Sequence, residues 1–361
     1  MKPLYHAPAA PVTAPGGGCG SGLADREGRV RISGPMTLRP PVPPGHEIVV
    51  ACASPADSGV AAALARHPGV LFVEHPPLDG PALAEAAAAA DVLVTRAWQR
   101  IDRSVLGAGA GRLRAVVQGS AGLDNIDHEA ASRMGVEVVA VDPGNATGVA
   151  ELTLLSLIAL WRGLPAHWSE TARGTWPDRE RLPDREIAGK TLGIVGLGRV
   201  GTRVSRRARA CEMTVLAVDP YIPEGRFREV GAERIGSLEE LLPRCDALSL
   251  HCPLTTETRG MIGAAQLDRL PAGVVLINTA RGGIVDEAAL AAALDAGRLS
   301  GAALDVFERE PVVVPGIASH RRVLATPHLA GHTAESHRAR ARNLVEVLDE
   351  LVVRLASEVP R

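Results

Sequence analysis

From His46 onward, short apolar runs alternate along the chain with longer, Ala-rich stretches. Runs such as Ile48–Ala51 and Val92–Thr95 are too short for helices and have no polar positions between the apolar ones, which is typical of strands buried on both faces. The stretches between them, such as Val60–Arg66 and Pro81–Ala90, are predicted helices. Strands separated by helices form parallel sheets, so the predicted fold is α/β with doubly wound parallel sheets.

The alternation occurs twice, on either side of a long helical stretch from about Ala146 to Arg173 that Pro165 is expected to kink or divide. A final helix is predicted at about Thr333–Ala356. At roughly 150 residues per domain, the 361 residues indicate two domains. The other predicted strands are Val70–Val73, Ala115–Gln118, Val136–Val141, Thr191–Val195, Thr214–Val218, Ala247–His251, Val274–Asn278, Gly301–Val306 and Val323–Ala325.

Residues 1–45 differ in composition from the rest. They contain nine prolines and eight glycines and show neither a helical nor a strand period. We therefore expect a flexible extension.

Composition excludes several classes of function. With 39 basic and 41 acidic residues, the formal net charge of −2 gives no electrostatic footprint for nucleic acid or an anionic membrane. No apolar run approaches the roughly 18 residues of a membrane-spanning helix. The five cysteines are scattered and form no CxxC pair, which favours reduced thiols in a cytoplasmic protein over disulfides or a metal site.

A glycine-rich motif, Gly196-Leu197-Gly198-Arg199-Val200-Gly201, follows one predicted strand and opens a helix. Gly196 permits a tight turn, Gly198 lets the backbone approach a pyrophosphate, and Gly201 allows close helix–strand packing. Asp219 lies 18 residues beyond Gly201 at the end of the next strand, where a carboxylate can bind ribose hydroxyls and repel a 2′-phosphate. Together these features predict binding of NAD rather than NADP. A turn-forming aspartate is the simpler alternative for Asp219.

Three more polar groups, Arg281, Glu310 and His328, each follow an apolar strand in the same half of the chain. Reduction of a 2-oxo acid by hydride needs a proton donor, which a histidine can be near neutral pH. A carboxylate can orient that histidine, and an arginine can hold the substrate carboxylate. An arginine, glutamate or histidine after a strand is more often an ordinary loop residue. The hypothesis of a catalytic site therefore depends on all three residues occurring together.

With these motifs, the sequence resembles the D-isomer-specific 2-hydroxyacid dehydrogenase family, in a short form without a regulatory domain. The resemblance covers about Ile48–Ala356. The matching stretches are Gly119–Asp127, Val149-Ala150-Glu151, Gly189–Gly201, His251–Thr255, Asn278–Gly282, Leu304–Pro311 and Thr326–Gly331.

The resemblance implies a Rossmann NAD domain at 146–330, inserted into a flavodoxin-like substrate domain made of 46–145 and 331–361. His328 would be the acid/base, Glu310 its orienting group, and Arg281 the ligand of the substrate carboxylate or carbonyl. The implied NAD-binding residues are Gly196, Gly198, Arg199, Val200, Gly201, Asp219, His251, Pro253, Thr279, Ala280 and Asp305. The implied substrate-binding residues are Thr95, Arg96, Ser120, Ala121, Gly122 and Arg281.

The sequence does not decide which 2-hydroxy acid is the substrate. Arg96 could bind a second anionic group, favouring a phosphorylated or phosphonate acid, whereas Trp98 could shape an apolar pocket. An NAD(H)-sensing corepressor-like protein, which keeps the site but acts by binding protein, is the alternative from another class. The resemblance also implies a homodimer formed through the region around Ala146–Arg173. No metal site is expected.

Overall fold

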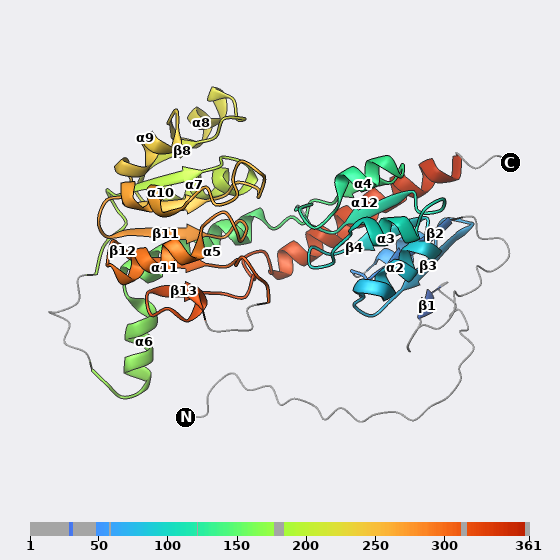
Figure 1. The fold of residues 1–361 in the computed structure, drawn as a ribbon, viewed down its shortest axis with the longest axis horizontal. Coiled ribbons are helices and arrows are strands. Elements are labelled where there is room, and N and C mark those ends of the chain that lie inside the picture. Colours follow the sequence, from blue (N-terminus) through green and yellow to red (C-terminus); the bar gives the residue numbers. More distant parts are fainter. Residues whose placement is uncertain are drawn as a thin grey trace.

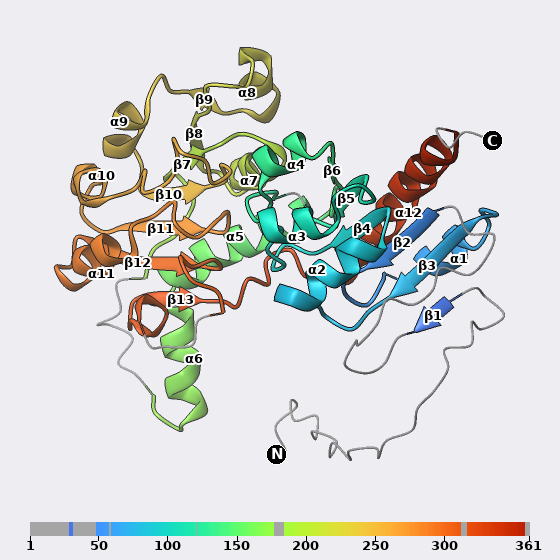
Figure 2. The same cartoon turned by 45° about the vertical axis from the view of Figure 1, so that its right-hand side comes forward.

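The computed structural model describes residues 29–31, 48–57, 59–120, 122–176, 184–311 and 316–357. These residues form two lobes, each built on a parallel β-sheet with helices on both faces (Figures 1 and 2). The predicted α/β class with two doubly wound parallel sheets is confirmed.

The first sheet has the strand order β1-β3-β2-β4-β5-β6 and is parallel throughout. Without the edge strand β1, the order is that of flavodoxin-like sheets, in which the chain starts in the interior and then extends to both sides. The strands are β1 (Arg29–Arg31), β2 (Ile48–Cys52), β3 (Val70–Glu74), β4 (Val92–Thr95), β5 (Ala115–Gln118) and β6 (Glu137–Ala140).

Helices cover both faces of this sheet. One face packs against α2 (Gly80–Ala89), α3 (Arg103–Ala108) and α4 (His128–Arg133) through Leu and Ala side chains. The other face packs against α1 (Val60–Leu64) and the last helix, α12 (Ala334–Ser357). The apolar runs are buried on both sides, which is why they show no polar alternation.

The second sheet has the order β13-β12-β11-β10-β7-β8-β9 and is also parallel. The chain runs outward from β7 through β8 and β9, then resumes at β10 on the other side of β7, as in Rossmann sheets. The strands are β7 (Thr191–Val195), β8 (Thr214–Val218), β9 (Glu233–Arg234), β10 (Ala247–Leu250), β11 (Val274–Asn278), β12 (Leu299–Leu304) and β13 (Val323–Ala325).

The helices of the second lobe form two layers. One layer contains α5 (Ala146–Trp161), α7 (Arg199–Ala210) and α8 (Glu224–Val230). The other contains α9 (Leu238–Leu241), α10 (Ala264–Arg269) and α11 (Glu287–Asp295). Helix α6 (Leu164–Ala172) projects from this lobe (Figure 1).

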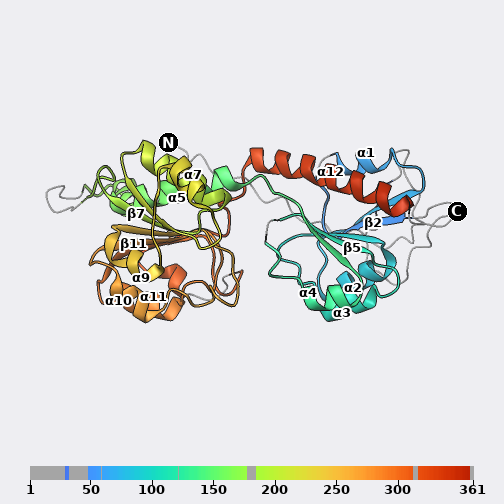
Figure 3. The ribbon, with the colours of Figure 1, turned by 90° about the horizontal axis from the view of Figure 1, so that it is seen from above.

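The chain passes between the lobes at two places in the sequence. It leaves the first lobe between β6 and α5, and it returns between β13 and α12 (Figure 3). The second lobe is therefore inserted between β6 and α12 of the first.

The predicted strands agree with the structure within about two residues. The two-residue strand β9 was not predicted, because Glu233 and Arg234 are both charged and exposed. The long helical stretch is divided, as expected near Pro165. Gly163 adopts a left-handed conformation (φ 53°), and Pro165 lies in the first turn of α6, where its missing N–H costs no hydrogen bond.

The expectation of a flexible extension over residues 1–45 needs one correction. Arg29–Arg31 form β1, which pairs in parallel with β3 as an edge strand. Backbone pairing with an existing sheet edge requires little apolar pattern, so the sequence gives no signal for it. Residues 1–28 and 32–45 lie outside the described residues.

Among the described residues, no single helix is long and apolar enough to cross a membrane; α5 and α6 meet the length and composition criteria only as a pair, bent by 68°.

Candidate active site

A large cleft of about 1620 Å³ lies between the two lobes, and both lobes contribute to its walls. The contributing loops follow strands of the two sheets. In open parallel sheets, the carboxyl ends of the strands form a crevice where the strand order reverses, and ligands bind there. The cleft is therefore placed where two such crevices face each other.

The glycine motif forms a tight turn between β7 and α7. Gly196 has φ 93°, and a Cβ there would lie 2.8 Å from the backbone nitrogen of Cys252. A Cβ on Gly201 would collide with the carbonyl oxygen of Gly196. A Cβ on Gly198 would meet nothing within 4 Å, so this residue faces open space at the N-terminus of α7. Such a cradle fits a pyrophosphate.

Asp219 follows β8, and its carboxylate supports the glycine turn. Its Oδ2 accepts a hydrogen bond from the Leu197 backbone N–H at 2.8 Å, and its Oδ1 accepts one from the Tyr221 N–H at 3.0 Å. Each oxygen retains a second lone pair for a ligand hydroxyl.

Other predicted NAD-binding residues line the cleft itself: Arg199, Val200, His251, Pro253, Thr279, Ala280 and Asp305. His251 follows β10, and burial lowers its pKa to about 3, so its ring is neutral. Its Nε2 contacts the Ser249 hydroxyl at 2.9 Å, whereas its buried Nδ1 has no partner among the described residues. This unsatisfied atom fits a polar group of a bound cofactor. Arg199 forms an ion pair with Asp142 of the first lobe.

Glu310 lies on the loop that follows β12, and His328 lies on the loop that follows β13. His328 Nδ1 is 2.6 Å from Glu310 Oε2, and Glu310 Oε1 accepts the Phe307 backbone N–H at 2.9 Å. The hydrogen bond and charge of Glu310 raise the pKa of His328 against the opposing effect of burial. Burial would raise the pKa of Glu310, but the contacts with His328 and Phe307 outweigh it and lower that pKa.

The His328 loop is held by Asp305, which is only 2% exposed. Asp305 Oδ1 accepts hydrogen bonds from the Thr326 hydroxyl at 2.6 Å and the Leu329 N–H at 2.9 Å. Its Oδ2 accepts the Ala330 N–H at 2.9 Å. These bonds hold His328 at φ 53°, an unfavourable backbone conformation for a residue with a Cβ. Asp305 thus organises the His328 loop at the wall of the cleft.

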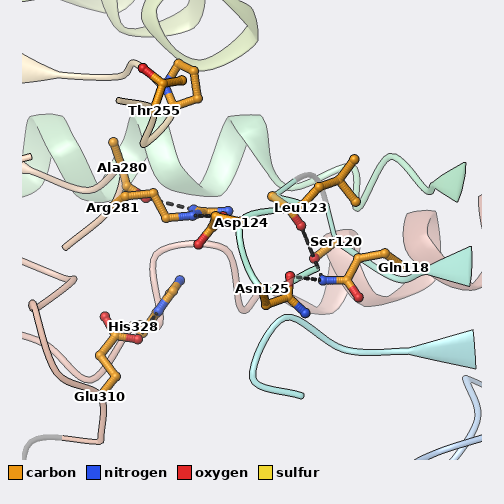
Figure 4. Close-up of polar contacts among 12 residues, drawn as sticks. Gln118, Ser120, Leu123, Asp124, Asn125, Thr255, Ala280, Arg281, Glu310 and His328 are labelled. Atoms are coloured by element: carbon orange, nitrogen blue, oxygen red, sulfur yellow. Dashed lines mark hydrogen bonds and ion pairs between the residues drawn. The ribbon is translucent and has the colours of Figure 1, made fainter. Parts of the chain in front are cut away.

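Arg281 extends from the end of β11 across the cleft towards the first lobe (Figure 4). Its Nε donates to Asp124 Oδ1 at 3.1 Å, and its Nη1 donates to the Ala280 carbonyl at 2.8 Å. Its Nη2 occupies the space that a Cβ on Gly122 would need. Arg281 and His328 thus line the same cleft as Gly119 and Gly122, and Glu310 contacts the His328 ring.

The predicted substrate-binding residues are not all in equivalent positions. Arg96, Ser120 and Gly122 line the cleft. Thr95 is fully buried, and its hydroxyl donates to the Gln118 side chain at 2.6 Å, so it supports the neighbouring loops from beneath. Ala121 lies outside the described residues.

Sequence reasoning assigned no role to three charged residues that contact the site. Asp124 binds Arg281, and Asp57 joins Arg96 to Arg340 of α12. Asp124 lies inside Gly119–Asp127, one of the stretches that match the family. That match is the sequence signal that could have identified Asp124 as a site residue. Asp57 and Arg340 are 283 positions apart in sequence, and nothing in the sequence pairs them. Among the described residues, no group of His, Cys, Asp and Glu side chains could hold a metal ion.

Comparisons with family models, curated proteins and solved structures agree on one protein family. Residues 154–330 match the family described as D-isomer specific 2-hydroxyacid dehydrogenase, NAD binding domain. The chain is 40% identical to an (S)-sulfolactate dehydrogenase from Chromohalobacter salexigens over 282 residues, covering 78% of this chain and 91% of that protein. It is 38% identical to a D-3-phosphoglycerate dehydrogenase from Methanocaldococcus jannaschii over 263 residues, covering 73% of this chain and 50% of that protein.

The chain thus spans about half the length of several of its curated relatives. Among solved structures, it resembles a D-lactate dehydrogenase from Aquifex aeolicus in complex with NAD and lactic acid, with a TM-score of 0.76 and 27% identity over 86% of this chain and 97% of that one. The second lobe is accordingly an NAD-binding domain. On these grounds, the chain belongs to the D-isomer specific 2-hydroxyacid dehydrogenase family.

Proposed function

We propose that this protein is an NAD-dependent oxidoreductase that interconverts a 2-hydroxy acid and a 2-oxo acid. The observation that carries the proposal is the 2.6 Å contact between His328 and Glu310, on a cleft that also contains Arg281. A histidine held by a carboxylate can exchange a proton with a hydroxyl, and an arginine beside it can bind a carboxylate.

In this mechanism Arg281 binds the substrate carboxylate and polarises the adjacent carbonyl. Backbone N–H groups of Ser120 and Gly122 complete the carboxylate site. His328 donates its proton to the carbonyl oxygen during reduction and accepts it back during oxidation. Glu310 holds the ring and stabilises its protonated form. When bound, NAD supplies or accepts the hydride.

The pH dependence follows from the raised pKa of His328. Reduction requires the protonated ring and is favoured below that pKa. Oxidation requires the neutral ring and is favoured above it.

We assign residues 146–330 to cofactor binding, and residues 46–145 with 331–361 to substrate binding. Gly196, Gly198 and Gly201 would receive the pyrophosphate and Asp219 the ribose hydroxyls. His251, Pro253, Thr279, Ala280 and Asp305 would surround the nicotinamide end. The fit is supported by the open space above Gly198 and by the unpartnered, buried Nδ1 of His251 among the described residues.

For the substrate, we favour an acid with a second anionic group, of the phosphorylated or phosphonate type. Arg96 lines the cleft and provides a second cation besides Arg281. A bulky apolar substrate against Trp98, which is 57% exposed and also lines the cleft, is the competing candidate.

We further propose a cytoplasmic homodimer that forms through α5 and α6. Four large apolar side chains are exposed in this region: Leu155, Leu164, Trp168 and Trp176. Light scattering should give twice the chain mass, and Trp168→Glu should give a monomer. A wild-type monomer would refute this assembly.

The proposed reaction is tested by following NADH oxidation over a panel of 2-oxo acids and their phosphorylated and phosphonate analogues. Rapid turnover of at least one compound is expected. Tight NADH binding with no turnover on the whole panel would contradict the proposal and favour the NAD(H)-sensing alternative.

A further inference from the structure

Two loops of the NAD-binding domain carry the proposed chemistry, and they pack directly against each other. Arg281 lies on the loop between β11 and α11, and Glu310 lies on the loop that follows β12 (Figure 4). A Cβ on Gly282 would collide with the carbonyl group of Phe307 and would lie 2.8 Å from the Glu308 nitrogen. The backbones of the two loops are therefore in contact immediately beside Arg281.

A reciprocal pair of hydrogen bonds also fastens the two loops to each other. Glu287 is the first residue of α11, and its Oε1 accepts the Glu308 backbone N–H at 2.6 Å. In return, Glu308 Oε1 accepts the Glu287 backbone N–H at 3.3 Å. This second bond satisfies one of the N–H groups that an α-helix leaves unpaired at its N-terminus. The pair of bonds thus clamps the start of α11 to the loop that carries Glu310.

Three carboxyl groups come close together at this clamp: those of Glu287, Glu308 and Glu310. Burial raises the pKa of Glu287, and the charges of Glu308 and Glu310 add to this effect against the opposing hydrogen bond from the Glu308 N–H. Like charges repel, so these carboxylates would move apart if the two loops were free to separate. The hydrogen bond between Glu287 and the Glu308 backbone opposes that separation.

The position of the clamped loop sets the position of the acid/base pair. The Phe307 N–H donates to Glu310 Oε1, and Glu310 Oε2 lies 2.6 Å from His328 Nδ1. The N–H groups of Phe307 and Glu308 are consecutive in the chain: the first orients the Glu310 side chain, and the second is bound by Glu287. A shift of this short backbone segment therefore moves the carboxylate that orients the His328 ring.

We propose that Glu287 is a positioning residue, which clamps the loop of Glu310 to the loop of Arg281 and keeps the acid/base pair aligned with the substrate-binding arginine. The proposal rests on the proposed function, which gives Glu310, His328 and Arg281 their roles. Of the described residues, Glu308 lines the cleft and Glu287 does not, so Glu287 acts through the Glu308 backbone and not by touching a ligand.

The first test compares the kinetics of Glu287→Ala and Glu287→Gln. Both variants remove the charge, but the glutamine keeps a side-chain oxygen that can accept the Glu308 N–H. For the best 2-oxo acid, kcat/KM of Glu287→Ala should fall about 5- to 30-fold, as expected for the loss of one half-buried hydrogen bond to a carboxylate. Because the hydrogen bond survives in Glu287→Gln, this variant should stay within about threefold of the wild type.

The second test measures the pKa of His328 by NMR titration of protein with labelled histidines, with His328→Gln used to identify the signal. The hydrogen bond and charge of Glu310 and the charge of Asp305 raise this pKa, whereas burial and the charge of Arg281 lower it. All these groups are retained in both Glu287 variants, so a changed pKa reports a movement of Glu310. The pKa should fall in Glu287→Ala, by less than in Glu310→Gln, and should keep its wild-type value in Glu287→Gln.

Glu239→Ala is the matched control, because Glu239 is an exposed glutamate in the first turn of α9 and is not among the described residues that line the cleft. It should leave both kcat/KM and the pKa of His328 unchanged. Equal losses in Glu287→Ala and Glu287→Gln would show that the charge matters and the hydrogen bond does not, which would overturn the proposal. Wild-type kcat/KM in Glu287→Ala would overturn it too.

The NMR titration separates this proposal from the proposed reaction. If no 2-oxo acid is turned over, the proposed function fails, but the pKa of His328 can still be measured. A lower pKa in Glu287→Ala, with the wild-type value in Glu287→Gln, would then still support the clamp. A wild-type pKa in Glu287→Ala would overturn the proposal whether or not the protein turns over a substrate, even if the variant is less stable.

Discussion

Arg281 of the NAD-binding domain and Asp124 of the other lobe form an ion pair across the cleft, with Nε and Oδ1 3.1 Å apart. The ion pair fixes one edge of the guanidinium and leaves Nη2 over Gly122. A carboxylate bound beside Gly122 would therefore meet an arginine that is already oriented.

Asp124→Asn should raise KM for the 2-oxo acid about two- to fivefold and change kcat less. The pair is partly exposed, with 27% and 40% of the side chains accessible, so its contribution is that of a surface pair, about 1 kcal/mol at most. Steady-state kinetics at low salt provides the measurement, and Glu129→Gln, at an exposed carboxylate that does not line the cleft, is the control. An unchanged KM would show that Arg281 needs no such support.

Glu310→Gln should lower the pKa of His328, because the carboxylate is the first cause of its elevation. The upper limit of the reduction profile and the lower limit of the oxidation profile should both move to lower pH. Turnover should fall about 10- to 100-fold through loss of ring orientation. Full pH profiles of kcat/KM in both directions provide the measurement. Profiles that coincide with those of the wild type would exclude a role for Glu310.

Gly198→Ala and Gly201→Ala separate cofactor binding from folding. The new methyl group at position 198 meets nothing within 4 Å, so stability should change by less than about 1 kcal/mol, while NADH affinity falls at least about tenfold. At position 201 the methyl group collides with the Gly196 carbonyl, so this variant should lose more than about 2 kcal/mol of unfolding free energy. Denaturation and NADH titration distinguish the two. Unchanged NADH affinity in Gly198→Ala would place the pyrophosphate elsewhere.

Asp305→Asn should destabilise the fold by about 2–3 kcal/mol. This buried carboxylate accepts three hydrogen bonds from the His328 loop through both oxygens, and an amide offers only one accepting oxygen. Urea denaturation measures the loss, with Asp295→Asn on the exposed end of α11 as the control. Wild-type stability in Asp305→Asn would contradict this account of the loop.

Much of the architecture was predictable because buried strands carry uninterrupted apolar runs. β4, β5, β7 and β11 lie where the sequence predicted them, since each is fully covered by helices. The glycine motif was predictable for another reason: its steric demands are local. Edge strands β1 and β9 form through backbone pairing, which leaves little mark on the sequence.

The site was predictable only in part. Arg281, Glu310 and His328 all follow strands of one sheet, so topology alone brings them to one edge. The contact of Asp124 with Arg281 depends on how the two lobes face each other, and the contact of Asp57 with Arg340 depends on how α12 returns to the first sheet. No local sequence pattern records either arrangement, so the roles of these residues could be recognised only in three dimensions.

The central claim is that His328 exchanges the proton during interconversion of a 2-oxo acid and a 2-hydroxy acid. The most direct measurement is the turnover number of His328→Gln for the best 2-oxo acid, together with the NADH dissociation constant of the same variant. We predict a loss of turnover of at least about a thousandfold with NADH affinity within about threefold of the wild type. Near-native turnover in His328→Gln would contradict the claim.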